Sequence, residues 1–285
     1  MTGIIDIGSN TVRLVMYDKG KQLSNKGLNS EIIKDTKNGV LSEEGIEKLC
    51  SQLNVLKEEA GENKVYAFAT YAVRVLKNKE EVKNIVFEKT NIDIDILSGE
   101  KEAEYDFIGL KSTLQKGESG IGADLGGGSC QIMYFENGNI TFSHSYPIGC
   151  RRIKNKFVSG NFPTEDETKN IERYIKEQLK DAENKSVKKI YMMGGTAKTT
   201  VKLYSFLNGN ENIDIIKKEK IKNLIDFIKE TPPEVIKKIL KNRYDNIVAG
   251  LIIMEQIAEK TGAEEIHIKK CGVRDGYLMK KEEMK

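Results

Sequence analysis

Residues 6–11 read Asp-Ile-Gly-Ser-Asn-Thr, and residues 124–129 read Asp-Leu-Gly-Gly-Gly-Ser. An apolar segment precedes each stretch, and a second apolar segment that ends at another Gly turn follows it. A repeat separated by the length of a domain predicts two similar domains rather than a solenoid. We expect a first domain at residues 1–119 and a second at residues 120–285, with a last helix that packs back on the first.

Strand-like and helix-like segments alternate along the whole chain, which predicts an α/β fold class. Strands are expected at residues 4–8, 12–17, 65–70, 94–97, 121–125, 131–135, 190–193 and 265–268. Helices are expected at about residues 43–59, 100–114, 165–182, 220–229 and 246–260. Thr164 followed by Glu167 has the spacing of a capping box, which marks the start of the third helix.

The bulk composition excludes several classes of protein. The 285 residues include 46 basic and 43 acidic side chains, so no global positive field indicates a DNA-binding protein. The four cysteines match no zinc pattern and no dense disulfide framework, which favours reduced thiols. No apolar run reaches the ~18 residues that span a membrane, and no signal peptide is recognisable. We therefore expect a cytoplasmic protein that binds neither DNA nor a membrane.

Each Asp-x-Gly turn can bind a phosphate together with a metal ion. Small residues at a hairpin tip let backbone N–H groups approach an anion closely. The preceding carboxylate, Asp6 or Asp124, can hold a divalent cation directly or through water. A single turn of this kind would be an ordinary Gly hairpin with a capping aspartate. Two copies at matched positions favour a phosphate site.

A third Gly turn and several arginines could join the same chemistry. Gly194-Gly195-Thr196 lies between a strand and a helix that contains Lys198, and such a junction aims a helix N-terminus at an anion. Arginine can contact two phosphate oxygens at once. For any lone arginine a solvated surface role is the simpler interpretation. The candidates are Arg13, Arg74 and Arg274.

A strand turns into a helix at Leu97-Ser98-Gly99, and three glutamates follow. A carboxylate in that first helical turn lies near the strand ends, where α/β proteins bind ligands, and could accept a hydrogen bond from an attacking water. Helix-start acidity alone would also explain all three residues. Spacing does not choose among Glu100, Glu102 and Glu104.

Taken in chain order, these motifs resemble those of the exopolyphosphatase / guanosine pentaphosphate phosphohydrolase (Ppx/GppA) family. The matching stretches cover nearly the whole chain. They are Asp-Ile-Gly-Ser-Asn-Thr-Val-Arg-Leu (6–14), Ala-Thr-Tyr-Ala-Val-Arg with Asn78 (69–78), Leu-Ser-Gly-Glu-Lys-Glu-Ala (97–103), Asp-Leu-Gly-Gly-Gly-Ser (124–129), Pro-Ile-Gly (147–149), Gly-Gly-Thr-Ala (194–197) and Gly-Val-Arg-Asp-Gly (272–276).

The resemblance implies two actin-like domains (the ribonuclease H-like, ASKHA superfold) with the site in an interdomain cleft. It implies Mg²⁺ and hydrolysis of a terminal phosphoanhydride of polyphosphate or guanosine pentaphosphate, and Asp124 matches a metal-site aspartate of the family. From the two turns we expect Mg²⁺, with Mn²⁺ as a substitute, to be held near Asp6 and Asp124. The resemblance selects Glu102 as the catalytic group. The expected phosphate-binding residues are Ser9, Asn10, Arg13, Arg74, Gly126, Gly127, Gly128, Ser129, Gly194, Gly195, Thr196, Lys198 and Arg274.

The chain departs from the family pattern at Gln131, where the family usually has a glutamate that assists the metal or the water. An amide supplies no negative charge, so we expect weak Mg²⁺ binding and slow turnover, and faster hydrolysis in Gln131→Glu. The alternatives are a strand residue without a role, or an amide selected as a hydrogen-bond donor. The last motif reads Arg-Asp-Gly instead of Arg-Glu-Gly, and the C-terminal helical domains of the long forms are not expected.

Two other functions remain open at this level. Because Gln131 replaces a glutamate, the chain could instead be a weakly active or non-catalytic regulator that binds polyphosphate or a guanine nucleotide. The superfold also hosts sugar and acetate kinases, and a fold does not fix a function. The sequence does not choose between polyphosphate and guanosine pentaphosphate, and it leaves the oligomeric state open, a homodimer included.

Overall fold

The computed structural model divides into two compact units. Unit 1 comprises residues 1–102 and 274–285, and unit 2 comprises residues 103–273. The sequence pattern places the boundary at residue 119; residues 103–119 belong to unit 2 here, and the C-terminal helix belongs to unit 1. The described residues are 1–9, 11–30, 32–183, 185–209, 213–240 and 243–283.

The strands, in chain order, are β1 (Thr2–Ile7), β2 (Thr11–Asp18), β3 (Lys21–Asn29), β4 (Thr36–Lys37), β5 (Val40–Leu41), β6 (Lys64–Ala69), β7 (Ile94–Ile96), β8 (Gly120–Leu125), β9 (Cys130–Glu136), β10 (Asn139–Tyr146), β11 (Lys189–Met193), β12 (Ile215–Lys217) and β13 (Glu265–Ile268). The helices are α1 (Glu43–Ala60), α2 (Tyr71–Arg74), α3 (Lys79–Thr90), α4 (Gly99–Lys111), α5 (Cys150–Phe157), α6 (Glu165–Gln178), α7 (Gly194–Leu207), α8 (Lys220–Glu230), α9 (Pro233–Leu240), α10 (Ile247–Lys260) and α11 (Val273–Glu283).

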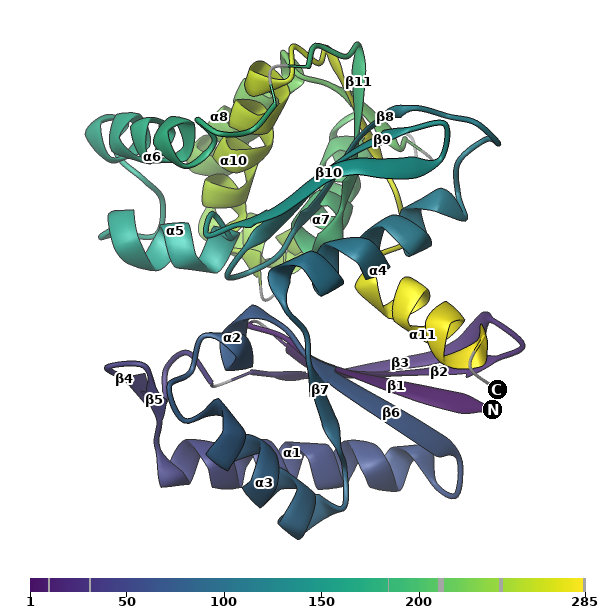
Figure 1. Cartoon of the computed structure of the whole chain (residues 1–285). Coiled ribbons are helices and arrows are strands. Elements are labelled where there is room, and N and C mark those ends of the chain that lie inside the picture. The colour runs from purple at the N-terminus through teal and green to yellow at the C-terminus, as the bar shows by residue number, and fades with distance from the viewer. Residues whose placement is uncertain (10, 31, 184, 210–212, 241–242, 284–285) are drawn as a thin grey trace. The chain divides into compact units, whose positions relative to one another are not determined.

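Unit 1 is built on a five-stranded sheet in the order β3-β2-β1-β6-β7. The first three strands of the chain are antiparallel, and β6 and β7 run parallel to β1. Helices α1 and α3 lie together on one side of the sheet (Figure 1). Helix α11 packs on the sheet through Tyr277, whose ring centroid lies 4.8 Å from that of Phe68 in β6.

Helix α1 illustrates why these residues form these elements. Ser42 caps its first turn by accepting a hydrogen bond from the Gly45 N–H at 3.1 Å. Its buried residues recur at helical spacing, so a single apolar stripe faces the sheet. Gly61 follows the last turn with a φ of 60°, a conformation that glycine adopts without steric cost.

Unit 2 is built on a six-stranded sheet in the order β10-β9-β8-β11-β13-β12. A large apolar core joins this sheet to helices α5 to α10, and α10 is buried on nearly all sides. The unit 2 part of α4 forms a second, smaller core against Met133, Phe135 and Tyr191. The sheet is therefore apolar on both faces, as expected for an α/β unit.

The repeat found in the sequence is confirmed at the level of strand register. In unit 1, Asp6 in β1 pairs with Arg13 in β2, and in unit 2, Asp124 in β8 pairs with Gln131 in β9. The Gly8 N–H donates to the Thr11 carbonyl at 3.1 Å, and the Gly126 N–H donates to the Ser129 carbonyl at 3.0 Å. Each hairpin continues into a third antiparallel strand, β3 or β10.

The strands and helices expected from the sequence are all present, and the Thr164–Glu167 capping box is confirmed at the start of α6. Strands β3, β4, β5, β10 and β12 and helices α2, α3, α5 and α9 were not predicted. Strand β3 is largely exposed and lacks apolar alternation, so only pairing with β2 makes it a strand.

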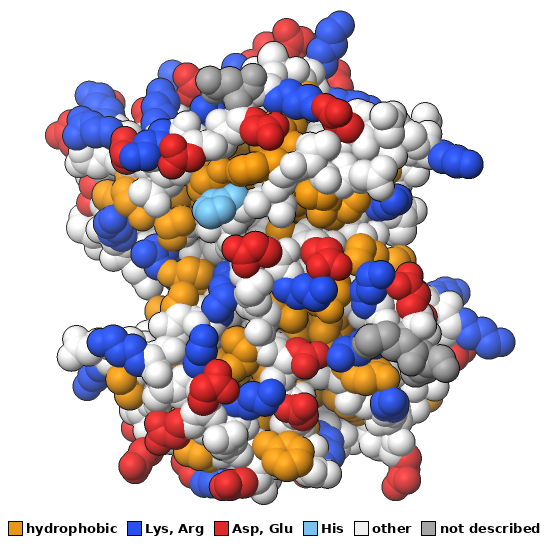
Figure 2. Space-filling model, viewed as in Figure 1, with side chains coloured by type: hydrophobic (Ala, Val, Ile, Leu, Met, Phe, Trp, Pro, Cys, Tyr) orange, Lys and Arg blue, Asp and Glu red, His pale blue; other side chains and the backbone are white. Residues whose placement is uncertain are grey.

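The surface carries charges of both signs. On the face that Figure 2 shows, basic and acidic side chains are interspersed, in keeping with the nearly balanced composition. Within the described part of the chain, no helix combines the length and the apolar character that crossing a membrane requires.

Candidate active site

The Asp124 turn of unit 2 forms a small cradle of backbone N–H groups. The carbonyls of Gly126 and Gly127 accept hydrogen bonds from the first turn of α5, with Cys150 N–H donating to Gly126 at 3.1 Å and Arg151 N–H to Gly127 at 2.9 Å. Among the described residues, the amides of Gly127 and Gly128 donate no hydrogen bond. The turn is thus anchored through its carbonyls, and two N–H groups are left for an anion.

The Pro-Ile-Gly motif holds this turn in place. Gly149 precedes α5, and a Cβ at this position would lie 2.4 Å from the backbone of Gly127 and Gly128. Its φ of −71° is open to any residue, so close packing is what requires glycine here. The motif therefore works as a backbone support for the Gly-Gly-Gly-Ser turn.

The Asp124 carboxylate is flanked by two glycines. A Cβ at Gly194 would lie 2.4 Å from Oδ1, and a Cβ at Gly272 would lie 3.4 Å from Oδ2. Gly194 also has a φ of 91°, which only glycine adopts readily. In the part of the chain that the structure describes, Asp124 makes no ion pair or hydrogen bond.

The Asp124 environment fits a hard divalent cation. A carboxylate oxygen is the ligand that Mg²⁺ prefers, and Mg²⁺ usually keeps several waters and substrate oxygens as its other ligands. The described residues contain no group of three or more potential metal ligands. Asp124 could therefore hold Mg²⁺ only together with water and phosphate oxygens, which suits a phosphate site.

The third Gly turn lies beside Asp124 and carries an arginine that the sequence analysis missed. Gly194 and Gly195 begin α7, and a Cβ at Gly195 would lie 1.8 Å from Nη2 of Arg243. Arg243 Nη1 donates to the fully buried Thr196 hydroxyl at 3.4 Å. Within the described chain, Arg243 has no carboxylate partner, so its charge is available to an anion.

No local pattern marks Arg243, because it lies 48 residues after Gly195 and reaches the turn only through tertiary packing. Lys198, which the sequence did select, lies in α7 one turn after the Gly pair and is half-buried.

A second carboxylate in unit 2 was also missed. Asp106 in α4 is fully buried. A Cβ at Gly272 would lie 3.7 Å from Asp106 Oδ1, so Asp106 and Asp124 both lie beside this glycine. Its spacing of four residues from Glu102 places both on one face of α4, and that helical spacing is the signal that could have found it.

In unit 1, the first Asp-x-Gly turn carries an ion pair. Asp6 at the end of β1 accepts a hydrogen bond from Arg274 Nη1 at 2.9 Å, so α11 supplies the counter-charge. Ser9 is buried in the turn. Asn10, predicted to bind phosphate, lies outside the described residues. Asp6 and Asp124 thus have different surroundings despite their matched positions.

The structure distinguishes the three glutamates at the start of α4. Glu102 is 7% exposed and accepts a hydrogen bond from Arg74 Nη1 at 2.6 Å, whereas Glu100 is exposed. Arg74 Nη1 also donates to the Leu97 carbonyl at 3.0 Å. The guanidinium thereby fixes the carboxylate at the strand–helix junction. Glu104 is half-buried.

Arg13 lies across strand β3. Its guanidinium donates to the Asn25 side-chain oxygen, and a Cβ at Gly27 would lie 2.8 Å from its Nη2. Gly27 faces Arg13 in the strand register, so the missing side chain makes room for the arginine.

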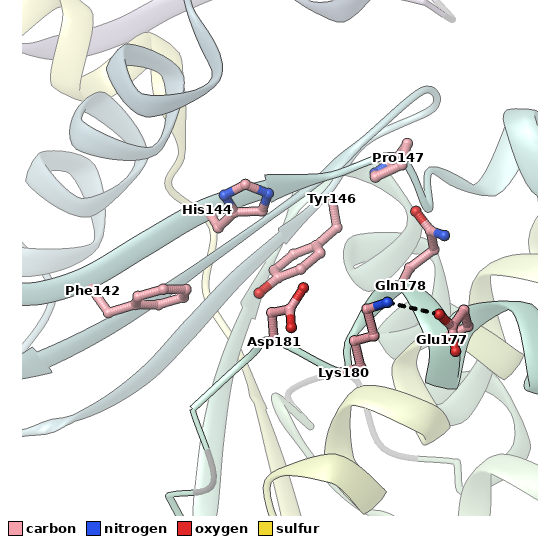
Figure 3. Close-up of a pocket in the computed structure, with 8 residues that line it drawn as sticks. All are labelled: Phe142, His144, Tyr146, Pro147, Glu177, Gln178, Lys180 and Asp181. Atoms are coloured by element: carbon pink, nitrogen blue, oxygen red, sulfur yellow. Dashed lines mark hydrogen bonds and ion pairs between the residues drawn. The ribbon is translucent and has the colours of Figure 1, made fainter.

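Two open hollows are lined by none of the predicted site residues, although Pro147 of the Pro-Ile-Gly motif borders one of them. The one in unit 2 has a volume of about 330 Å³ between β10 and the end of α6, where the ring centroids of His144 and Tyr146 lie 4.7 Å apart (Figure 3). The one in unit 1 has a volume of about 490 Å³ and includes Asp95 and Tyr277.

Comparison with known proteins shows which family the chain belongs to. The model of the Ppx/GppA phosphatase family matches residues 29–285. The chain belongs to this family. A Ppx/GppA family member from Aquifex aeolicus has a similar structure, with a TM-score of 0.81, 26% sequence identity and coverage of 99% of this chain and 97% of that one. The α/β, actin-like fold class predicted from the sequence is thereby confirmed.

Other relatives extend the comparison. A bifunctional 3-dehydroquinate synthase/phosphatase of Fusobacterium nucleatum is 30% identical over 92% of this chain, which spans only 44% of that protein's length. Exopolyphosphatase 1 of Mycobacterium tuberculosis is 22% identical over 98% of this chain and 87% of its own length. An exopolyphosphatase from Cytophaga hutchinsonii, at 21% identity and a TM-score of 0.87, covers 99% of this chain and 98% of that one and shares the fold.

Proposed function

We propose that this chain is a phosphoanhydride hydrolase that removes terminal phosphates from inorganic polyphosphate and releases orthophosphate. Membership of the Ppx/GppA phosphatase family supports a phosphatase, and the exopolyphosphatase relatives support polyphosphate as the substrate. The observation that carries the proposal is the Asp124 turn, which combines a carboxylate without an ion-pair partner in the described chain with two backbone amides that donate no hydrogen bond there.

In this proposal the phosphate chain is bound by hydrogen-bond donors, not by carboxylic acids. The amides of Gly127 and Gly128, the Ser129 hydroxyl and the Arg243 guanidinium each supply hydrogen-bond donors. Charge-assisted hydrogen bonds of this kind are about twice as strong as neutral ones. Phosphoryl transfer depends mainly on positioning and on charge stabilisation, so such donors contribute directly to the rate.

Asp124 would hold Mg²⁺, or Mn²⁺ in its place, together with water and phosphate oxygens. A divalent cation neutralises phosphate oxygens and stabilises the charge that develops as the anhydride breaks. Asp6 is the second candidate ligand, although Arg274 already balances its charge. Other residues of unit 1 proposed to meet phosphates are Ser9, Arg13, Arg74 and Arg274, and Lys198 of unit 2 joins them.

Glu102 orients the attacking water. Its carboxylate accepts a hydrogen bond from the water, whose oxygen forms a bond to the terminal phosphorus while the bridging P–O bond breaks. The water's proton passes to the carboxylate or to the leaving phosphate oxygen. The 2.6 Å contact with Arg74 keeps the carboxylate in one orientation, so positioning is its first role and proton removal its second.

A side-by-side assay tests the proposal. Orthophosphate release is measured with long-chain polyphosphate, tripolyphosphate and guanosine pentaphosphate, each with Mg²⁺ present. We expect release from polyphosphate at the highest kcat/KM. Preferential release from guanosine pentaphosphate would identify that nucleotide as the substrate. No release from any of the three would support a regulator that only binds phosphate chains. Transfer of phosphate to a sugar or to acetate would support a kinase.

A cytoplasmic location belongs to the same proposal. All four cysteines are buried and none forms a disulfide, which is usual for a protein in a reducing compartment.

A further inference from the structure

Gln131 occupies the centre of a polar row that crosses the sheet of unit 2. It lies in β9, directly opposite Asp124 in β8 on one side and Ser145 in β10 on the other. Residues directly opposite each other on neighbouring strands project to the same face. Ser129, two residues earlier in the chain, shares that face because side chains alternate along a strand.

The Gln131 amide uses its nitrogen to hold two hydroxyl groups. Nε2 donates to Ser129 Oγ at 3.0 Å and to Ser145 Oγ at 2.9 Å. The side chain is 1% exposed and Ser129 is 3% exposed, so these hydrogen bonds are shielded from water. An amide nitrogen carries two hydrogens, and both are used here.

The direction of these hydrogen bonds determines what Ser129 can offer to a ligand. A hydroxyl has one hydrogen and two acceptor lone pairs. Because Ser129 Oγ accepts from Gln131, its own hydrogen remains for another acceptor, and among the described residues Ser129 Oγ makes no other hydrogen bond. Ser129 is also the last residue of the Gly-Gly-Gly-Ser turn, whose amides are placed for an anion.

We propose that Gln131 is a positioning residue that keeps the Ser129 hydroxyl hydrogen directed at a phosphate oxygen of the substrate. The inference rests on the proposed function, and it makes the anion-binding part of the site a set of donors. It also favours the interpretation that Gln131 was selected as a hydrogen-bond donor over the interpretation that it merely replaces a metal-binding glutamate.

A glutamate at this position would have the opposite effect on Ser129. A carboxylate only accepts hydrogen bonds, so the Ser129 hydroxyl would turn its hydrogen toward the introduced carboxylate and lose it for the phosphate. The new carboxylate would also lie directly opposite Asp124, and like charges at that position repel. Gln131→Glu is therefore expected to weaken phosphate binding instead of accelerating hydrolysis.

A double-mutant cycle tests the proposal. The dissociation constant of tripolyphosphate is measured by calorimetry for wild type, Gln131→Glu, Ser129→Ala and the double variant, at saturating Mg²⁺ so that metal affinity does not enter. We expect each single variant to bind about tenfold more weakly, since each loses one charge-assisted hydrogen bond to phosphate. The double variant should bind more weakly than Ser129→Ala only by the repulsion that the added carboxylate brings, because both single changes remove the same Ser129 contact.

A neutral variant separates the loss of the two hydrogen bonds from the repulsion between carboxylates. Gln131→Met keeps the side-chain length and adds no charge but removes both N–H donors, so the Ser129 hydroxyl is no longer oriented. We expect Gln131→Met to weaken binding a few-fold when Ser129 is present and not at all when it is combined with Ser129→Ala. Losses that multiply in the Gln131→Met/Ser129→Ala double variant, or unchanged or tighter binding by Gln131→Glu, would overturn the positioning role.

The outcomes also separate this inference from the proposed function. A wild-type protein that binds tripolyphosphate but releases no orthophosphate would refute the hydrolase and still report the coupling between Gln131 and Ser129. A wild-type protein that hydrolyses normally but shows no coupling would refute the positioning role alone. Circular dichroism confirms that each variant is folded before its binding constant enters the cycle.

Discussion

Glu102 is the residue on which the proposed chemistry depends most directly. It is buried against Arg74, whereas Glu100 in the same helical turn is exposed. We expect Glu102→Gln to lower kcat by ~10²–10⁴-fold while leaving KM for polyphosphate nearly unchanged, because a positioned acid or base contributes about that much. The matched control is Glu100→Gln, which should retain wild-type kinetics. Equal kcat for Glu102→Gln and wild type would contradict the assignment.

Arg243 is the binding residue that only the fold revealed. Its guanidinium lies over the Gly195 backbone and contacts the Thr196 hydroxyl. Arg243→Ala should raise KM for polyphosphate by about 10–100-fold, since a hydrogen bond to a charged group contributes about 1.5–3 kcal/mol. Arg173→Ala removes the same charge from the exposed side of α6 and serves as the control. If both variants raise KM equally, the effect on KM comes from the protein's net charge and not from a contact between Arg243 and phosphate.

At the scale of elements, the packing of Gly149 on the Gly-Gly-Gly-Ser turn sets the shape of the cradle. A Cβ 2.4 Å from the Gly127 and Gly128 backbone forces the turn and the start of α5 apart. We expect Gly149→Ala to lower the free energy of unfolding by about 1–3 kcal/mol and to raise KM, since overpacking displaces the phosphate-binding amides.

Urea denaturation and steady-state kinetics measure the two effects of Gly149→Ala. The control is Gly160→Ala, because the nearest heavy atom to a Cβ there is 3.8 Å away. Gly160→Ala should change stability by less than about 0.5 kcal/mol. A KM unchanged by Gly149→Ala would mean that the turn does not bind phosphate.

Glu118, two residues before β8, links that segment to β11. Burial opposes ionisation of this carboxyl, but hydrogen bonds from Tyr191, Lys189 and the Gln115 N–H outweigh it and lower the pKa of Glu118 to about 2. The Lys189 contact is 3.0 Å. A carboxyl whose folded-state pKa is depressed stabilises the protein above its unfolded pKa, and that stability is lost as pH falls toward 2.

We therefore expect Glu118→Gln to lower the free energy of unfolding by about 1 kcal/mol at neutral pH, after allowance for solvent screening. The difference from wild type should shrink as pH falls from 4.5, the ordinary value, toward 2. Urea denaturation at a series of pH values measures it. Glu177→Gln, in an exposed ion pair with Lys180, should show almost no effect at any pH. A difference for Glu118→Gln that is independent of pH would exclude the charge as its origin.

At the scale of the whole molecule, activity should require a divalent metal. We expect a chelator to abolish orthophosphate release, and Mg²⁺ or Mn²⁺ to restore it. Asp124→Asn should need at least about tenfold more Mg²⁺ for half-maximal activity, because ligand charge tunes cation affinity. Asp226→Asn, on the exposed side of α8, should need the same Mg²⁺ concentration for half-maximal activity as wild type. Full activity in excess chelator would rule out the metal.

Much of the fold could be predicted because its signals are local. The Asp-x-Gly turns fixed the positions of β1, β2, β8 and β9, since a Gly turn between two apolar segments is typical of a hairpin. Strand β3 escaped prediction because its residues are mostly exposed, and it exists through its hydrogen bonds to β2. The division at residue 102 also lay outside the sequence pattern, because α4 continues across it without a break.

By itself, the sequence determined the repeated turns, the two aspartates and the family resemblance, all of which depend on residue type and short-range spacing. The resemblance had already selected Glu102, but only the tertiary structure buried it against Arg74, placed Arg243 on Gly195 and set Gln131 between Asp124 and Ser145. The reason is physical. Burial and partners depend on strand register and helix packing, which bring together residues far apart in the chain, and no local periodicity encodes those distances.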